Sequence, residues 1–270
     1  MSKIAFVKAH ACGNDFLVME ERAAQGRHAA LAKRLCARHT GVGADGIEFL
    51  ERRADGTHFL RLFNADGSEA ELSGNGTRCV AAWLAQSEGL KEVAFGTHGG
   101  VRTCRVVRRE DAAWWIESGM GVPRVMPRKI EIAGVGVIDG AMVNVGNPHY
   151  VIFTEQEDFG SHGLSWQELG AKISVDPMFK FGTNVEFVRV LSSKEIAFRI
   201  YERGCGPTMS SGTGTCAASA TSMELRGAAR ELTAAAPGGA QVVVWLDAAS
   251  EMLLTGPAEI ICTGEAEFGE

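Results

Sequence analysis

Hydrophobic and polar positions alternate over short stretches of the chain, a pattern that predicts β-strands rather than long helices. Strand-like runs in the first half of the chain have glycines clustered at their edges, and they occupy residues 15–20, 46–51, 57–63 and 101–107. A helical period is confined to segments at about residues 27–39, 75–86, 165–173 and 214–225. The pattern therefore predicts an α/β (α+β) chain in which sheets predominate.

Two of the helical segments begin with nearly the same string, Ser-Gly-x-Gly-Thr, at Ser73 and at Ser211. Both strings are followed by an alanine-rich stretch, and they lie 138 residues apart (211 − 73) in a chain of 270 residues. A repeat at about half the length of the chain predicts an internal duplication and two similar domains.

A break in the strand pattern at residues 119–127, GMGVPRVMP, predicts the boundary between these domains. We expect the last apolar runs, at residues 252–268, to return to the sheet of the first domain. The first domain would then comprise residues 1–120 plus about 258–270, and the second domain residues 121–257.

The composition is that of an ordinary globular protein, with 46% hydrophobic residues, 22% charged residues and a mean hydropathy of zero. The net charge of −6 and the lack of a basic run argue against a nucleic-acid partner. Lys8 and His10 interrupt the stretch where a signal peptide needs apolar residues, and no later segment has about 18 uninterrupted apolar residues. We therefore expect a cytoplasmic protein without a membrane partner.

The sequence carries no signature for a metal or an organic cofactor. Its seven cysteines are widely spaced and form no CxxC pair, which predicts reduced thiols rather than disulfides or a zinc site. Residues 41–46 satisfy GxGxxG, but a helical segment precedes them and a strand follows, the reverse of the order in a dinucleotide-binding motif. We expect neither a metal nor a cofactor.

The two Ser-Gly-x-Gly strings place unpaired backbone N–H groups at the positive end of a helix dipole, where a carboxylate binds well. If both helix ends faced one cleft, a small anion between them would have a hydroxyl on each side, from Ser73 and from Ser211. That arrangement would suit an α-carboxylate whose α-carbon is flanked from opposite faces. The alternative is that both serines are ordinary N-caps.

A second group of polar residues lies at the ends of apolar runs: Asn14, Asn64, Asn147, Asn184, Glu202 and Arg203. Neutral amides together with Glu202 and Arg203 could bind a zwitterionic amino acid, with the guanidinium on a carboxylate and the glutamate on an ammonium. His149 could orient a neighbouring residue. The alternatives are turn-forming asparagines, a surface ion pair and a histidine that caps a turn.

The chain resembles the diaminopimelate epimerase family in an ordered series of strings: HACGNDF (10–16), GVGADG (41–46), NADGSEAELSGNGTRC (64–79), GNPHYVIF (146–153), TNVEF (183–187) and YERGCGPTMSSGTGTCAA (201–218). The resemblance implies two pseudo-symmetric domains, each a curved, mostly antiparallel sheet around a central helix. It also implies cofactor-independent interconversion of LL- and meso-diaminopimelate, an amino-acid isomerase reaction of lysine biosynthesis, with a small amino acid as the partner. Whether the chain forms a homodimer stays open.

The resemblance assigns site roles by position. Substrate contacts fall on Asn14, Asn64, Asn147, Asn184, Glu202 and Arg203, and the backbone groups that hold the reacting carboxylate fall on Gly74, Asn75, Gly212 and Thr213. His149 and Glu202 match positions that are important for activity.

The chain departs from the family at the two acid-base positions, where the family has cysteines and this chain has Ser73 and Ser211. A thiol has a pKa of about 8.5, whereas an aliphatic alcohol lies nearer the ~15.7 of water. Cys79 and Cys216, inside the predicted helices, are not expected to replace the missing thiols. Two alternatives to an active epimerase remain: an engineered Cys-to-Ser form or a paralogue that binds amino acids without turnover, and an isomerase or lyase for another substrate.

Overall fold

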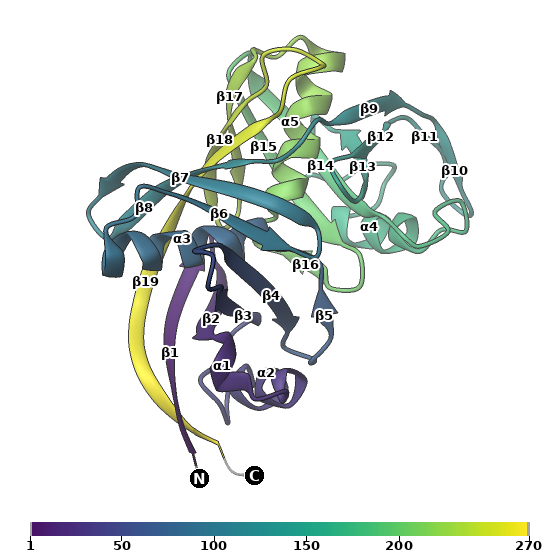
Figure 1. Cartoon of the computed structure of the whole chain (residues 1–270). Coiled ribbons are helices and arrows are strands. Elements are labelled where there is room, and N and C mark those ends of the chain that lie inside the picture. Colours follow the sequence, from purple (N-terminus) through teal and green to yellow (C-terminus); the bar gives the residue numbers. More distant parts are fainter. Residues whose placement is uncertain (1, 269–270) are drawn as a thin grey trace. The chain divides into compact units, whose positions relative to one another are not determined.

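The computed structural model describes residues 2–268, which divide into two compact units. Unit 1 runs to Ser118 and resumes at Thr255, and unit 2 comprises Gly119–Leu254 (Figure 1). The sequence placed the same divisions at 120/121 and 257/258. No helix within the described residues is long and apolar enough to cross a membrane.

Unit 1 is a curved sheet whose hydrogen-bonded pairs form a closed series. Its strands are β1 (Ser2–Ala11), β2 (Asn14–Glu20), β3 (Gly46–Arg52), β4 (His58–Asn64), β5 (Glu69–Ala70), β6 (Glu92–Thr97), β7 (Gly100–Glu110), β8 (Ala113–Gly119) and β19 (Leu253–Phe268). β2 and β3 are parallel, as are β4 and β6, and the other pairs with a described register are antiparallel. β19 pairs with β1, so the C-terminal strand returns to the first sheet as the sequence predicted.

The helix α3 (Gly74–Glu88) packs against β1, β2, β3, β6 and β7 on the inner side of this sheet. Its apolar residues join Leu50 and Phe95 in one core. The helices α1 (Glu21–Ala24) and α2 (His28–Leu35) pack on the other face, where Leu31 contacts a second core that contains Ile47 and Phe49. β3 is therefore buried on both faces.

Unit 2 repeats this order of strands. Its sheet contains β9 (Arg124–Pro127), β12 (Ala141–Asn144), β13 (Pro148–Phe153), β14 (Asn184–Ser192), β15 (Glu195–Glu202), β16 (Gly206–Thr208), β17 (Glu231–Ala236) and β18 (Gly239–Val244), and a separate hairpin contains β10 (Ile130–Ile132) and β11 (Gly136–Ile138). β13 and β14 are parallel, as are β15 and β17, and the other pairs are antiparallel. The parallel steps thus fall at the same places as in unit 1.

The helix α5 (Gly212–Arg226) is the counterpart of α3 and has the same length of 15 residues. It contacts β9, β12, β13, β14, β15, β17 and β18, which surround it in Figure 1. α4 (Trp166–Ser174) packs against β14 and β15 with a second core, which includes Leu169 and Phe187. The predicted fold class is confirmed: each unit is a mostly antiparallel sheet around a central helix.

The four predicted helices are all present. α3, α4 and α5 begin within two residues of the predicted starts, whereas α2 ends at Leu35 rather than at His39. α1 was not predicted, because a helix of four residues is too short to show a period.

Candidate active site

Ser73 and Ser211 are the N-cap residues of α3 and α5. The backbone N–H of Gly76 donates to Oγ of Ser73 at 3.0 Å, and the N–H of Gly214 donates to Oγ of Ser211 at 3.2 Å. Both serines have extended backbone angles, so the helix begins at the glycine that follows. Each serine oxygen thus accepts one of the N–H groups that have no partner within the helix. The N–H groups of the first two helical residues remain available to another acceptor.

In unit 1 the predicted residues Asn14 and Asn75 are in contact. Nδ2 of Asn75 donates to Oδ1 of Asn14 at 3.1 Å, and Nδ2 of Asn14 donates to Asp45 at 2.6 Å. Asn75 is the second residue of α3 and is 2% exposed. The interaction places the start of β2 beside the first turn of α3.

Asn64 lies at the end of β4, opposite Gly46, and its side chain donates to Oγ of Ser68 at 3.0 Å. The two residues also pair through the backbone of the same turn. The side-chain contact of Asn64 is therefore local to its turn, which is the turn-forming alternative considered from the sequence.

In unit 2 the equivalent contact joins Asn147 to Thr213. Nδ2 of Asn147 donates to Oγ1 of Thr213 at 3.3 Å, and Oγ1 of Thr213 lies 3.4 Å from Oγ of Ser211. Asn147 directly precedes β13, as Asn14 begins β2, and Thr213 is the second residue of α5, as Asn75 is of α3. The two units therefore repeat one arrangement at the helix N-terminus.

His149 is fully buried and lies between two polar groups. Its Nδ1 is 2.6 Å from Oε1 of Glu186, and its Nε2 donates to Oδ1 of Asn147 at 2.8 Å. Burial raises the pKa of Glu186, and the charge and hydrogen bond of His149 oppose that effect without cancelling it. Because the amide oxygen of Asn147 can only accept, Nε2 carries a hydrogen, and one further proton is shared between Nδ1 and Glu186. His149 therefore orients Asn147.

Asn184, Glu202 and Arg203 lie together where β14 begins and β15 ends, at the same edge of the sheet as His149. Oδ1 of Asn184 accepts from the backbone N–H of Arg203 at 2.9 Å, and its Nδ2 donates to the carbonyl of Pro148 at 3.2 Å. Oε1 of Glu202 accepts from Thr208 at 2.6 Å. The guanidinium of Arg203 donates to the carbonyl of Phe181 at 2.9 Å, and Arg203 is exposed.

The thiols inside the central helices are poorly placed for proton transfer. Cys79 and Cys216 are both 0% exposed. Burial raises the pKa of Cys79 far above its ordinary value. Burial of this kind disfavours the thiolate of Cys79.

Two buried glutamates escaped the sequence analysis. Glu48 on β3 and Glu186 on β14 are 1% and 0% exposed, and they lie against Gly76 and Gly214, the third residues of α3 and α5. Burial raises the pKa of Glu48 to about 8. The internal duplication could have revealed both glutamates. Residues 46–49 (GIEF) and 184–187 (NVEF) each carry one glutamate at the same place in an apolar run.

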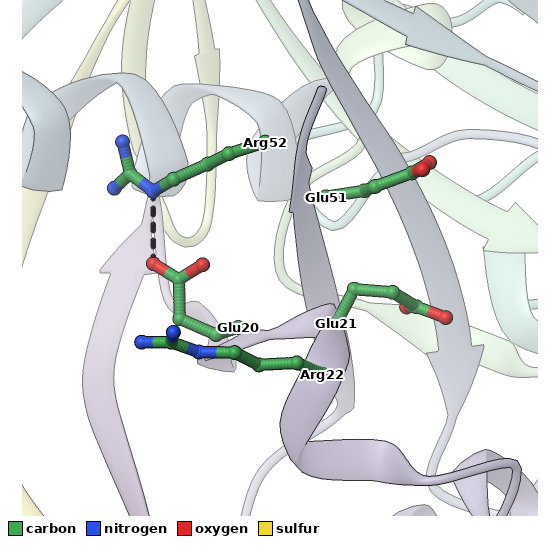
Figure 2. Close-up of a pocket in the computed structure, with 5 residues that line it drawn as sticks. All are labelled: Glu20, Glu21, Arg22, Glu51 and Arg52. Carbon is green, nitrogen blue, oxygen red and sulfur yellow. Dashed lines mark hydrogen bonds and ion pairs between the residues drawn. The ribbon is translucent and has the colours of Figure 1, made fainter. Parts of the chain in front are cut away.

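Two surface hollows have neither Ser73 nor Ser211 in their lining. One, of about 360 Å³, is lined by Glu20, Glu21, Arg22, Glu51 and Arg52, and Figure 2 shows these charged side chains, which come from the end of β2, from α1 and from the end of β3. Arg52 pairs with Glu20 at 3.0 Å, so part of this charge is compensated. A second hollow, of about 430 Å³, includes Phe181 and Arg203 in its lining, so one predicted site residue borders it. Among residues 2–268, no three His, Cys, Asp or Glu side chains are grouped to hold a metal ion.

Solved structures share the fold of this chain over nearly its whole length. The chain is similar to a phenazine biosynthesis protein of the PhzF family from Bacillus anthracis, with a TM-score of 0.77, 14% identity, and coverage of 99% of this chain and 100% of that chain. It is also similar to a hydroxyproline epimerase from Agrobacterium vitis, with a TM-score of 0.72, 14% identity, and coverage of 98% and 91%. At this identity the likeness defines the fold alone.

Sequence comparison identifies the family within that fold. The diaminopimelate epimerase family model matches residues 6–126 and 141–261. The diaminopimelate epimerase of Synechocystis is 34% identical over 98% of this chain and 99% of its own length, and that of Pelotomaculum thermopropionicum is 34% identical over 97% and 99%. The chain belongs to the diaminopimelate epimerase family.

Proposed function

We propose that the protein is an amino-acid epimerase that inverts the α-carbon of diaminopimelate between the LL and meso isomers without a cofactor. Family membership supports the reaction, and the arrangement found at both helix N-termini supports the site. The proposal includes a cytoplasmic location, where a reducing environment keeps thiols such as Cys36, Cys79 and Cys104 free.

The observation that carries the proposal is the repeated half-site. Each half consists of an N-cap serine, a glycine that begins the helix, and a polar second residue bonded to an asparagine at the start of a strand. The unpaired N–H groups of the first helical turn favour a carboxylate. A carboxylate bound there would be stabilised as its α-carbon loses a proton, because negative charge then spreads onto the carboxylate oxygens.

The remaining predicted residues would hold the rest of the amino acid. Hydrogen bonds hold Asn14 and Asn147 next to the helix starts, and the side chain of Asn147 also accepts a hydrogen bond from His149. Arg203 is exposed, and its planar guanidinium suits a second carboxylate. Glu202 would accept from an ammonium group.

Ser73 and Ser211 would stand at the two acid-base positions. Each oxygen already accepts a backbone N–H, and Oγ of Ser211 also lies 3.4 Å from Oγ1 of Thr213. Loss of a proton from an alcohol is far harder than from a thiol, since the pKa values are near ~15.7 and about 8.5. We therefore expect slow turnover with the substrate recognition of the family.

The test is incubation of LL-diaminopimelate with the protein in D₂O, followed by NMR and mass spectrometry. Deuterium at the α-carbon with formation of the meso isomer supports the proposal. Loss of a leaving group with a fall in mass would instead favour a lyase. Tight binding without exchange would mean that recognition is retained and the chemistry is lost, which contradicts the proposed reaction.

A matched pair of variants tests the binding site. We expect Arg203→Ala to weaken diaminopimelate binding, because a carboxylate loses its cation. Arg226→Ala removes the same charge in the same unit, at the last residue of α5, where Arg226 lies over the ring of Phe153. Equal affinity for the two variants would contradict the assignment of Arg203.

A further inference from the structure

Glu48 lies beneath the first turn of α3 in apolar surroundings. It is the third residue of β3, with Val18 directly opposite on β2 and Leu62 directly opposite on β4. Its carboxyl group is pressed against Gly76, where a Cβ would overlap Oε1. Among residues 2–268, Oε1 of Glu48 has no hydrogen-bond partner.

Glu186 occupies the equivalent place beneath α5. Val151 and Ile200 lie directly opposite it on the neighbouring strands, and a Cβ on Gly214 would lie 3.0 Å from its Oε1. Glu186, however, is next to His149, which can neutralise it.

The residue of unit 1 that corresponds to His149 is Phe16. His149 lies opposite Asn184, two residues before Glu186, and Phe16 lies opposite Gly46, two residues before Glu48. A phenyl ring offers no hydrogen bond and no charge. Phe16 therefore cannot neutralise the carboxyl group of Glu48 as His149 can neutralise that of Glu186.

Glu48 acts on the thiol of Cys79 together with charged and titratable groups from α3 and from the start of β2. On α3 the group is Arg78, and at the β2 end the groups are Cys12 and Asp15. Asp15 is paired with Arg38 at 2.8 Å and with Lys8 at 3.2 Å.

Arg78 is 0% exposed, and within residues 2–268 it forms no ion pair. Its Nη2 donates to Oδ1 of Asn75, whereas its Nε and Nη1 have no hydrogen-bond partner within the described part of the chain. With the carboxyl group of Glu48 neutral, the buried guanidinium of Arg78 leaves the first turns of α3 with a positive charge. Such a charge favours the binding of an anion at the helix N-terminus.

We propose that the protonation of Glu48 controls carboxylate binding at the N-terminus of α3. With its proton, Glu48 leaves the positive charge of Arg78 and of the helix dipole available to the ligand. Without its proton, Glu48 places a negative charge under the same turn and repels the ligand. The inference rests on the proposed function, because the ligand is the carboxylate of diaminopimelate.

The change falls in an accessible range of pH. Burial raises the pKa of Glu48 to about 8, so the group is mostly protonated at neutral pH and ionises in mildly alkaline solution. Glu48 is thus a positioning residue that acts through the electrostatic potential at the site.

The experiment measures the Kd of diaminopimelate by calorimetry from about pH 6.5 to about pH 9.5 for the wild type and for Glu48→Gln. Glutamine has the shape of the protonated carboxyl group and cannot ionise. The ratio of the two Kd values cancels the titration of the ligand itself. We expect the wild type to lose at least about tenfold in affinity relative to Glu48→Gln as the pH rises.

Glu51→Gln is the matched control. It removes the same charge from the same strand, but Glu51 is at the surface and pairs with Arg53. We expect its pH profile to follow the wild type. In parallel, the infrared carbonyl band of a protonated carboxylic acid should disappear from the wild type with rising pH and should be missing from Glu48→Gln.

Parallel Kd profiles for the wild type and Glu48→Gln would overturn the inference and leave the proposed function standing. Binding by neither protein at any pH would overturn the proposed function, and the inference with it. If Glu48→Gln did not fold, a wild-type infrared band that persisted through the pH range while the affinity fell would also refute the role of Glu48.

Discussion

Replacing Ser73 and Ser211 together by cysteine should raise the rate of α-hydrogen exchange by orders of magnitude. Both positions are N-caps whose side-chain oxygen accepts a backbone N–H, at 3.0 Å from Gly76 and 3.2 Å from Gly214. A sulfur in the same position would receive the same N–H groups and the positive end of the helix dipole. Both influences favour the thiolate over the thiol.

The size of the gain follows from two opposing effects. The pKa of a thiol lies about seven units below that of an alcohol, which at a fixed pH makes the thiolate about 10⁷ times more abundant than the alkoxide. The alkoxide is the stronger base and therefore removes a proton faster than the thiolate does. With a Brønsted coefficient of about 0.5, this higher reactivity offsets roughly half of the difference in abundance on a logarithmic scale. A gain of about 10³-fold or more remains, equivalent to about 4–5 kcal/mol of barrier.

The assay is deuterium incorporation into LL-diaminopimelate in D₂O, measured for the wild type and for the double variant at the same concentration. Ser165→Cys is the matched control, because Ser165 is also a helix N-cap in unit 2 and accepts from the N–H of Glu168 at 3.3 Å, but it lies on α4. We expect its exchange rate to equal that of the wild type. A folded double variant that binds the ligand but exchanges at the wild-type rate would refute the two-thiol interpretation of the pocket.

Three further predictions concern stability. Gly76→Ala should destabilise unit 1 by about 1–3 kcal/mol in urea unfolding, because the new Cβ would overlap Glu48; an unchanged midpoint would contradict this packing. The pKa of Glu48 is raised from 4.5 to about 8, so between these values the native state holds a proton that the unfolded state has lost. The free energy of unfolding should therefore fall by about 1.4 kcal/mol per pH unit as the pH rises through this range, and Glu48→Gln should remove this slope. Burial raises the pKa of Asp15, but hydrogen bonds and charges from Arg38 and Lys8 outweigh it and the net direction is down. The contribution of Asp15 to the free energy of unfolding should therefore be present above its ordinary pKa of 3.8 and be lost as the pH falls through its lower pKa in the native state. Between about pH 4 and about pH 2, Asp15→Asn should lose less stability than the wild type does.

The fold was largely predictable because the strongest signals in the sequence are local. The Ser-Gly-x-Gly strings mark helix starts through hydrogen bonds that span three residues, and both serines are N-caps in the structure. The return of β19 to β1 could be expected from the length of the last apolar run and is confirmed by their pairing. The end of α2 was predicted too late because residues 36–39 continue the helical period but lie in a turn instead.

The site was predictable only where its residues are polar at the ends of strands. Asn14, Asn147 and Asn184 lie at the ends of strands. Asn14 and Asn147 form hydrogen bonds with the second residues of α3 and α5. Glu48 was missed because alternation in residues 46–51 suggests a solvent-facing glutamate, whereas β3 is covered by helices on both faces and does not have a solvent side. Glu186 was missed as the partner of His149 because the two are 37 residues apart, and a contact at that separation depends on the pairing of β13 with β14.

A duplicated backbone would by itself give two identical helix N-termini, whereas a two-base epimerisation needs two groups in opposite protonation states during each turnover. One group must lack a proton and remove hydrogen from the α-carbon, while the other holds a proton and delivers it. The two units have the same strand order, the same N-cap serine and a buried glutamate under the third residue of the helix, and they differ in the residue beside that glutamate. In unit 2 His149 shares a proton with Glu186, and in unit 1 Phe16 leaves Glu48 to keep a proton of its own. The exchange of one histidine for one phenylalanine thus places a hydrogen-bonded pair beneath α5 and, among the described residues, an unpaired carboxyl oxygen beneath α3, so the two helix N-termini differ in their electrostatic surroundings within the same architecture.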